Sequence, residues 1–148
     1  MKEKILLVII SIILIIFVSY FIPKENFSFG STITAKISNV TLELVVADTD
    51  KKRTLGLSGL EKFPPQSGGM IFIFDEPDYL SFWMKDMKFP IDIIWFDESK
   101  RIVNLEENLS PDTYPQVFTS QVLAKYVLEV PANFVFKNKI KIGDQIYF

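Results

Sequence analysis

An uninterrupted apolar segment near the start of the chain most constrains how the rest can fold. Residues 5–22 read ILLVIISIILIIFVSYFI and carry no charge. As a helix rising about 1.5 Å per residue, this segment would extend about 27 Å, close to the hydrocarbon thickness of a bilayer. Because a helix that is apolar on every face does not suit the surface of a small soluble domain, we count the folded domain from the residues that follow.

The segment has three interpretations: an uncleaved membrane anchor, a cleaved signal peptide and a buried core helix. The core helix is disfavoured because the segment is apolar on every face and lies at the extreme terminus. The apolar run is long for a signal peptide, and the nearest small-residue site, Ser28 to Gly30, comes late. A lipoprotein anchor is excluded because the chain has no cysteine to acylate. Lys2 and Lys4 outweigh Glu3, which predicts a cytoplasmic N-terminus and an exported remainder. We expect a membrane-anchored protein, or a secreted one if the segment is cleaved.

The rest of the chain divides into a short tether and one β-rich domain. We assign residues 1–23 to the anchor or signal segment, 24–30 to the tether and 31–148 to an extracytoplasmic domain. Apolar and polar residues alternate through much of this domain, as in strands with one buried face. Strands are predicted over residues 33–37, 40–46, 70–74, 80–85, 91–96, 101–106, 125–130 and 145–148.

Short helices and turns are predicted between these strands. Asp48 or Thr49 can cap a helix that ends near Leu57, and residues 131–138 fit one or two helical turns. Residues 75–78, Asp-Glu-Pro-Asp, have the composition of a turn. The predicted fold class is α+β and mainly β: a small barrel-like domain of about eight short strands with one or two short helices, preceded by an N-terminal transmembrane helix.

The absence of cysteine and histidine excludes whole chemistries. The chain can contain no disulfide, thiol nucleophile, imidazole base, or histidine or thiolate zinc ligand. Residues 24–148 carry 14 Lys and Arg against 17 Asp and Glu, a net charge of −3, so nucleic acid is not expected as a partner. No phosphate loop, EF-hand or serine-nucleophile motif occurs. We therefore predict neither a metal nor a cofactor.

Aromatic and charged residues are densest in the segment 81–96, SFWMKDMKFPIDIIWF. Trp83 and Lys85 would share one face of a strand. Aromatic residues interleaved with polar ones can stack a sugar or a base, and they also occur in any half-buried strand. The candidate ligand-binding surface combines Trp83, Lys85, Trp95 and the loop containing Tyr114.

Asp92 is the only polar side chain within residues 89–96, a segment that is apolar on both faces. A buried carboxylate must be paired, hydrogen-bonded to the backbone, protonated or open to water. The structural interpretation is a buried ion pair, with Arg53 or Lys85 as partner, or a turn cap. The functional interpretation is a tuned acid or a metal ligand. The catalytic candidates are therefore Asp92, Glu129, Lys85 and Arg53.

Several short motifs occur in a characteristic order: GGMIFIFDEP, SFWMKDMKFPIDIIWFDE, RIVNLEENLSP, YVLEVP and KIGDQI. Together they resemble the family known as domain of unknown function 192, over about residues 38–148. The resemblance implies a small, mainly β protein, often exported behind a signal or anchor segment, and leaves its biochemical role open. The family positions present here are Arg53, Gly56, Gly69, Met70, Phe74, Phe82, Trp83, Met84, Lys85, Pro90, Asp92, Tyr126, Glu129, Pro131, Gly143 and Asp144.

The sequence departs from this family pattern at a few positions. Asp86 stands where asparagine is more common, and Ser58 stands where methionine is common. The loop from Ser110 to Ser120 is also less typical, so the resemblance supports no ligand site there.

Three functions are compatible with these observations. The leading hypothesis is a membrane-tethered extracytoplasmic binding or accessory module, whose partner is an envelope glycan, peptide or protein. The alternative is a carboxylate-dependent hydrolase or lyase that uses Asp92 or Glu129, with Lys85 or Arg53 stabilising negative charge. A purely structural partner of another envelope protein is the third, and it predicts an exposed apolar patch.

Overall fold

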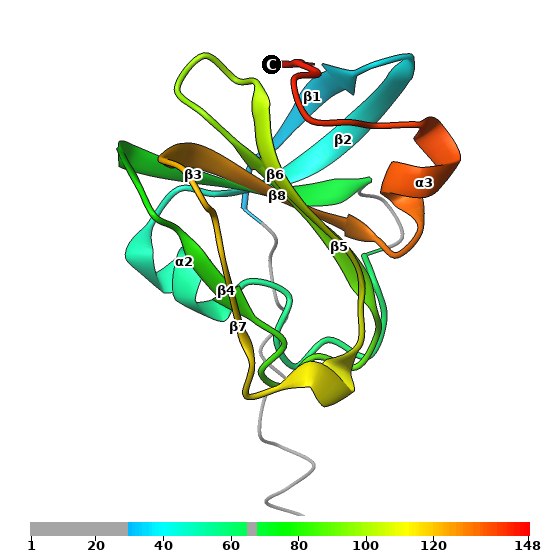
Figure 1. The fold of residues 1–148 in the computed structure, drawn as a ribbon. Helices are drawn as coiled ribbons and strands as arrows, with labels where there is room; N and C mark the ends of the chain where they lie inside the picture. The colour runs from blue at the N-terminus through cyan, green and yellow to red at the C-terminus, as the bar shows by residue number, and fades with distance from the viewer. Residues whose placement is uncertain (1–29, 65–67) are drawn as a thin grey trace, which may run out of the picture.

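The computed structural model describes residues 30–64 and 68–148. The predicted anchor or signal segment and residues 24–29 of the predicted tether lie outside the described residues. Within the described ranges, no helix has the length and apolar character needed to cross a bilayer. Figure 1 shows a curved sheet with short helices at its margins.

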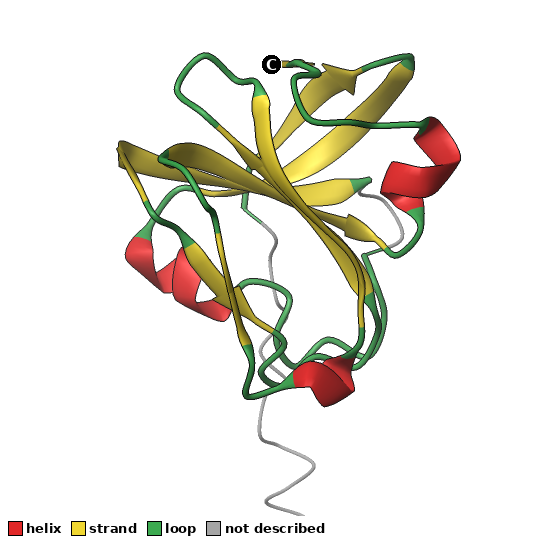
Figure 2. Cartoon of the chain, viewed as in Figure 1, coloured by secondary structure: helices red, strands yellow, loops and turns green. Residues whose placement is uncertain are grey.

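Seven strands form one sheet in the order β6-β5-β8-β3-β2-β1-β9. Figure 2 shows the strands in yellow and the short helices in red. They are β1 (Thr32–Ile37), β2 (Val40–Ala47), β3 (Gly69–Asp78), β5 (Ile91–Phe96), β6 (Ile102–Leu109), β8 (Ala124–Pro131) and β9 (Ile146–Tyr147). Neighbouring strands are antiparallel except β2 and β3, which run parallel. A separate antiparallel pair consists of β4 (Ser81–Trp83) and β7 (Val117–Thr119).

The two edge strands of the large sheet approach each other at one end. Arg101, just before β6, forms an isolated antiparallel bridge with Gln145, just before β9. Ile102 N–H also donates to the carbonyl oxygen of Asp144 at 2.8 Å. The sheet is therefore curled into a half-barrel, and the predicted mainly β class is confirmed.

Three short helices connect or cover the strands. They are α2 (Asp50–Leu55), the 3₁₀ helix η1 (Pro111–Thr113) and α3 (Phe134–Asn138). As predicted, Thr49 caps α2, since its hydroxyl accepts a hydrogen bond from Lys52 N–H at 3.4 Å. The helix ends earlier than Leu57 because Gly56 turns the chain with a φ of 52°.

Both faces of the curled sheet are buried, which explains why all six residues of β5 are inaccessible. Ile93 belongs to one apolar cluster and the next residue, Ile94, belongs to the other. Leu57, after α2, and Phe118 of β7 contribute to the first cluster, whereas Val135 of α3 contributes to the second. Helix α2 and the β4–β7 pair therefore cover the face of the sheet opposite to α3.

Three local predictions need correction. Residues 75–78 are not a turn, because β3 continues to Asp78, which pairs with Ala124 after a register shift that begins at Ile73. Pro77 is tolerated there because an irregular ladder does not require its missing N–H. Strand β4 has only three residues instead of the predicted 80–85, and the predicted loop between 106 and 125 contains η1 and β7.

Candidate functional site

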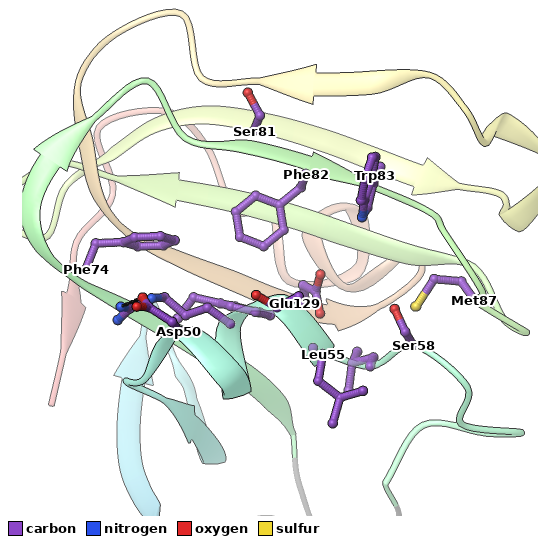
Figure 3. A pocket seen from close by; sticks show the side chains of 14 residues that line it. Asp50, Leu55, Ser58, Phe74, Ser81, Phe82, Trp83, Met87 and Glu129 are labelled. Carbon is purple, nitrogen blue, oxygen red and sulfur yellow. Dashed lines mark hydrogen bonds and ion pairs between the residues drawn. The ribbon is translucent and has the colours of Figure 1, made fainter.

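A cavity of about 420 Å³ lies between α2, β4 and the large sheet (Figure 3). Helix α2 and the turn after it supply one wall, with Asp50, Arg53 and residues 54–58. The short strand β4 supplies another, with residues 81–83. Phe72 and Phe74 of β3, Met87 and Glu129 of β8 complete the lining.

Glu129 is the buried polar group of this cavity. Its strand lies between β3 and β5, where Glu129 pairs with Met70 on one side and Ile93 on the other. The residue is only 5% exposed, and its Oε2 atom has no hydrogen-bond partner among the described residues. Burial disfavours the charged form and raises the pKa of Glu129 from 4.5 to about 8. At neutral pH the carboxyl group that lines the cavity is therefore mostly protonated.

Two glycines allow the chain to pack closely around Glu129. A Cβ at Gly69 would lie 2.8 Å from the backbone oxygen of Glu129, so only glycine permits the observed approach of β3 to β8. A Cβ at Gly56 would lie 3.3 Å from Cζ of Phe72 and 4.0 Å from Oε2 of Glu129. The missing side chain at Gly56 leaves space beside the carboxyl group.

Arg53 lines the same cavity, but its hydrogen bonds are directed elsewhere. Nη1 donates to the carbonyl oxygen of Ile73 at 2.7 Å, and Nη2 donates to Oδ1 of Asp50 at 2.6 Å. The guanidinium carbon lies 5.1 Å from the centroid of the Phe74 ring. The charges of Arg53 and Asp50 thus offset each other, and Glu129 gains no ion pair from them.

Aromatic side chains form the wall opposite α2. The Phe82 ring meets Phe72 edge-to-face, with centroids 4.9 Å apart. Trp83 is 51% exposed at the rim, and its ring centroid lies 6.0 Å from that of Tyr114 and 5.7 Å from Nζ of Lys85. Three of the four residues predicted to form a ligand surface therefore lie together, although Trp83 is the one of them that lines the cavity.

The structure does not place Trp95 with this group. Its side chain is fully buried, and its indole N–H donates to the carbonyl oxygen of Leu80 at 3.0 Å. Trp95 packs in the core beside Phe82, with ring centroids 6.1 Å apart. It supports the aromatic wall from behind and is not a surface for a ligand.

Asp92 lies outside the cavity, and backbone groups satisfy its carboxyl. Oδ1 accepts hydrogen bonds from Asn108 N–H at 2.8 Å and Asn133 N–H at 3.1 Å, and Oδ2 accepts one from Val135 N–H at 2.9 Å. These donors belong to β6 and to the start of α3. Of the two structural interpretations, the backbone cap is observed, and neither Arg53 nor Lys85 forms an ion pair with Asp92.

The two departures from the family pattern are neighbours in space. Ser58 donates its hydroxyl proton to the carbonyl oxygen of Lys85 at 2.9 Å, and Gly59 N–H donates to the carbonyl oxygen of Asp86 at 2.9 Å. Asp86 has a φ of 57°, a conformation in which aspartate and asparagine are favoured. These hydrogen bonds connect the turn after α2 to the segment just after β4.

Sequence reasoning missed the contributions of Asp50 and of the residues that follow Arg53. Glu129 was a catalytic candidate within the predicted strand 125–130, but the sequence could not show that a cavity lies in front of its carboxyl group. The glycine after α2 was the available indication that backbone and side chains approach closely there.

Fold and cavity together define a small half-barrel domain with a mixed aromatic and polar pocket. A family profile described as "Uncharacterized ACR", domain of unknown function 192 (DUF192), matches residues 32–148. The chain therefore belongs to the DUF192 family, as its motifs predicted. No significant match exists among the curated proteins.

Solved structures similar to this chain include the following two. One is a protein of unknown function from Novosphingobium aromaticivorans, with a TM-score of 0.76, 23% identity, and coverage of 84% of this chain and 90% of that one. The other, from Sinorhizobium meliloti, is proposed to be a transcription regulator; its TM-score is 0.72 and its identity 25%, with coverage of 79% and 93%. The first comparison supports the fold alone.

Proposed function

We propose that this domain is a binding or accessory module that takes a small ligand in the cavity at Glu129. The observation that carries the proposal is a buried carboxyl oxygen that faces the cavity and has no hydrogen-bond partner within residues 30–64 and 68–148. Buried polar groups are nearly always hydrogen-bonded, so such an atom calls for a functional explanation. A bound ligand that pairs with Oε2 would supply the missing hydrogen bond.

The size and lining of the cavity agree with this function. A volume of about 420 Å³ lies within the range of small-molecule sites, which are mostly apolar with a few polar groups. Here Phe82 and Trp83 supply apolar surface, while Glu129 and the Arg53–Asp50 pair supply polar groups. Nucleic acid suits the domain poorly, because residues 30–148 carry 13 Lys and Arg against 16 Asp and Glu.

We further propose that the module is tethered to the outer side of a membrane by its N-terminal segment. The support is the uncharged run over residues 5–22 together with Lys2 and Lys4 before it. Fractionation of cells that express the full chain tests this proposal. The protein is expected in the membrane fraction after a carbonate wash and should be digested by protease added outside. Recovery in the soluble fraction, or protection from the protease, contradicts the tether.

The two tryptophans provide an internal control for a ligand screen. The full chain contains Trp83 and Trp95, so its NMR spectrum should show two indole N–H resonances. A small-molecule library is added to the full chain in lipid nanodiscs. A cavity ligand is expected to shift the Trp83 resonance and to leave that of Trp95 in place, since Trp95 is buried and bonded to Leu80.

Two variants test whether a hit from this screen binds at the rim of the cavity. Trp83→Ala should weaken the binding of any hit, whereas Tyr79→Ala removes a comparably exposed aromatic side chain outside the cavity and should leave binding unchanged. A screen without hits, or hits that Trp83→Ala and Tyr79→Ala weaken equally, argues against a binding site in this cavity.

A second candidate function is a carboxylate-dependent hydrolase or lyase. It is favoured by Glu129, whose raised pKa of about 8 keeps a proton available for a general acid. The other carboxylate that lines the cavity, Asp50, is engaged by Arg53. If a ligand found in the screen is turned over, and Glu129→Gln binds it without turnover, catalysis is supported; a ligand recovered unchanged supports the binding module.

A further inference from the structure

We infer that the cavity binds an uncharged ring that carries several hydroxyl groups, a sugar or cyclic polyol, with one oxygen accepting a hydrogen bond from Glu129. This inference rests on the proposed binding function and specifies the ligand class. It follows from three properties of the site: the state of the carboxyl group, the balance of charge around it and the chemistry of the walls.

The first property is the unpaired oxygen of Glu129. The side chain is nearly inaccessible, points into the cavity and has space in front of it because Gly56 lacks a side chain (Figure 3). A neutral carboxyl group offers one O–H donor and one carbonyl acceptor. The raised pKa of Glu129 agrees with this neutral form. An uncharged oxygen in a ligand can accept from the O–H without any change of charge in the apolar surroundings.

The second property is the charge around Glu129. Among the lining residues, α2 supplies the charged groups Asp50 and Arg53, which pair with each other at 2.6 Å. The lining residues from β3, β4 and the segment after it are Phe72, Phe74, residues 81–83 and Met87, all uncharged. A cationic ligand would require Glu129 to ionise among these groups. An anionic ligand would have to compete with Asp50 and the Ile73 carbonyl for Arg53.

The third property is the combination of aromatic and hydroxyl groups on the walls. Phe82 and Trp83 present rings on one side, suited to the apolar C–H face of a sugar ring. The Ser58 hydroxyl donates its hydrogen bond to the Lys85 carbonyl, so the lone pairs of its oxygen remain available to accept a hydrogen bond from a ligand hydroxyl. The site thus donates at Glu129 and accepts at Ser58, and hydroxyl groups can do both in return.

The test measures binding of monosaccharides, N-acetylated monosaccharides and inositols to the full chain in nanodiscs, at pH 6 and pH 9. Because the protonated carboxyl is the binding form, affinity should fall about tenfold between these pH values for a pKa near 8. Glu129→Gln keeps a donor and should bind with little change in affinity across this pH range. Glu107→Gln, an exposed residue of β6, should behave as wild type.

Methylammonium and acetate are included as charged probes. If either one shifts the Trp83 resonance while the sugars and polyols do not, the inferred ligand class is overturned and the binding function stands. An affinity that rises with pH also overturns it, because the ionised carboxylate would then be the binding form. If neither these probes nor the wider library shifts Trp83, both proposals fail. The wild-type pH dependence decides the question even if Glu129→Gln does not fold.

Discussion

Asp92 and Glu129 lie on adjacent strands, yet their carboxyl groups point to opposite faces of the sheet. Glu129 on β8 pairs directly with Ile93 on β5, so these two side chains point to the same face of the sheet. Asp92 is the neighbour of Ile93 along β5, and successive side chains of a strand point to opposite faces. Asp92 points toward the start of α3, where backbone N–H groups surround it. Glu129 points toward the cavity, where its Oε2 atom has none. Two acidic residues in similar apolar strands thus have unrelated roles.

Asp92→Asn should destabilise the fold. The asparagine side chain has one acceptor oxygen in place of two, and its NH₂ group would face a backbone donor such as Val135 N–H. Leaving a buried donor unpaired and removing charge-assisted bonds predicts a loss of about 2–4 kcal/mol in the free energy of unfolding. Urea denaturation followed by circular dichroism measures this loss.

The matched control for this change is Asp112→Asn, at an exposed residue of η1, which should change stability by less than about 0.5 kcal/mol. Ligand binding by Asp92→Asn, measured well below its unfolding temperature, should equal that of wild type. Unchanged stability combined with lost binding or turnover would restore Asp92 as a functional residue.

Glu129 should make the stability of the protein depend on pH. Its pKa is about 8 in the folded state and 4.5 ordinarily, so between these values the unfolded chain has lost a proton that the folded chain retains. The free energy of unfolding therefore falls as pH rises from about 4.5 to 8, by up to about 4–5 kcal/mol for such a shift. Glu129→Gln should remove this fall.

Denaturation curves at pH 5, 7 and 9 test the expectation. Glu129→Gln and wild type should be similar at pH 5, and the variant should be the more stable protein at pH 9. Glu107→Gln, which changes an exposed carboxylate, provides the comparison for general effects of charge. Parallel curves for wild type and Glu129→Gln would mean that the Glu129 carboxyl has an ordinary pKa.

Local patterns in the sequence identified most strands and their buried faces. The alternation in Val40–Ala47 reflects a strand with one face more deeply buried, and the apolar run of Ile91–Phe96 reflects a strand buried on both faces. Such patterns depend only on which faces of the strand are covered. The composition of residues 75–78 led to a wrong prediction of a turn, because pairing of β3 with β8 overrides the local turn preference of these residues. The three-residue strand β7 is too short to have a period of its own.

The cavity could not be predicted in the same way, because its walls come from distant parts of the chain. Residues of α2, β3, β4 and β8 meet only through the order β8-β3-β2 and the packing of the small sheet on the large one. The same limit explains the two tryptophans: both lie in aromatic segments, but Trp83 is half exposed on β4 and Trp95 is fully buried in β5. Glu129 was a candidate by composition, and only the fold distinguishes it from Asp92.

Arg53 should contribute to stability through the backbone and the Phe74 ring more than through its ion pair. Its side chain is 14% exposed, whereas that of Asp50 is 97% exposed. Arg53→Lys cannot keep both the bond to the Ile73 carbonyl and the cation–π contact with Phe74, and should lose about 1–2 kcal/mol. Asp50→Asn should lose less than about 0.5 kcal/mol, because exposed ion pairs are weak.

Both variants are compared by urea denaturation at low and high salt. The Asp50→Asn effect should shrink further in high salt, while the Arg53→Lys effect should persist. Equal losses for the two variants would indicate that the ion pair, and not the contact with β3, fixes α2 on the sheet.

Gly56→Ala should impair both stability and the cavity. The φ of 52° already disfavours a side chain, and a Cβ would lie 3.3 Å from the Phe72 ring and 4.0 Å from Oε2 of Glu129. Gly59→Ala is a control for alanine at a positive φ, since Gly59 has a φ of 77° and nothing lies within 4 Å of the added Cβ. We expect a loss of about 1 kcal/mol for Gly59→Ala and about 2–3 kcal/mol for Gly56→Ala.

The difference in stability between these two alanine variants combines packing against Phe72 with the extra backbone strain at Gly56, whose ψ is −132°. Ligands that shift the Trp83 indole resonance should bind Gly59→Ala as they bind wild type, and Gly56→Ala more weakly, because the new methyl group occupies the space beside the Glu129 carboxyl. If Gly56→Ala binds as well as Gly59→Ala, the ligand does not reach Glu129, and the site must lie nearer the rim formed by Trp83 and Tyr114.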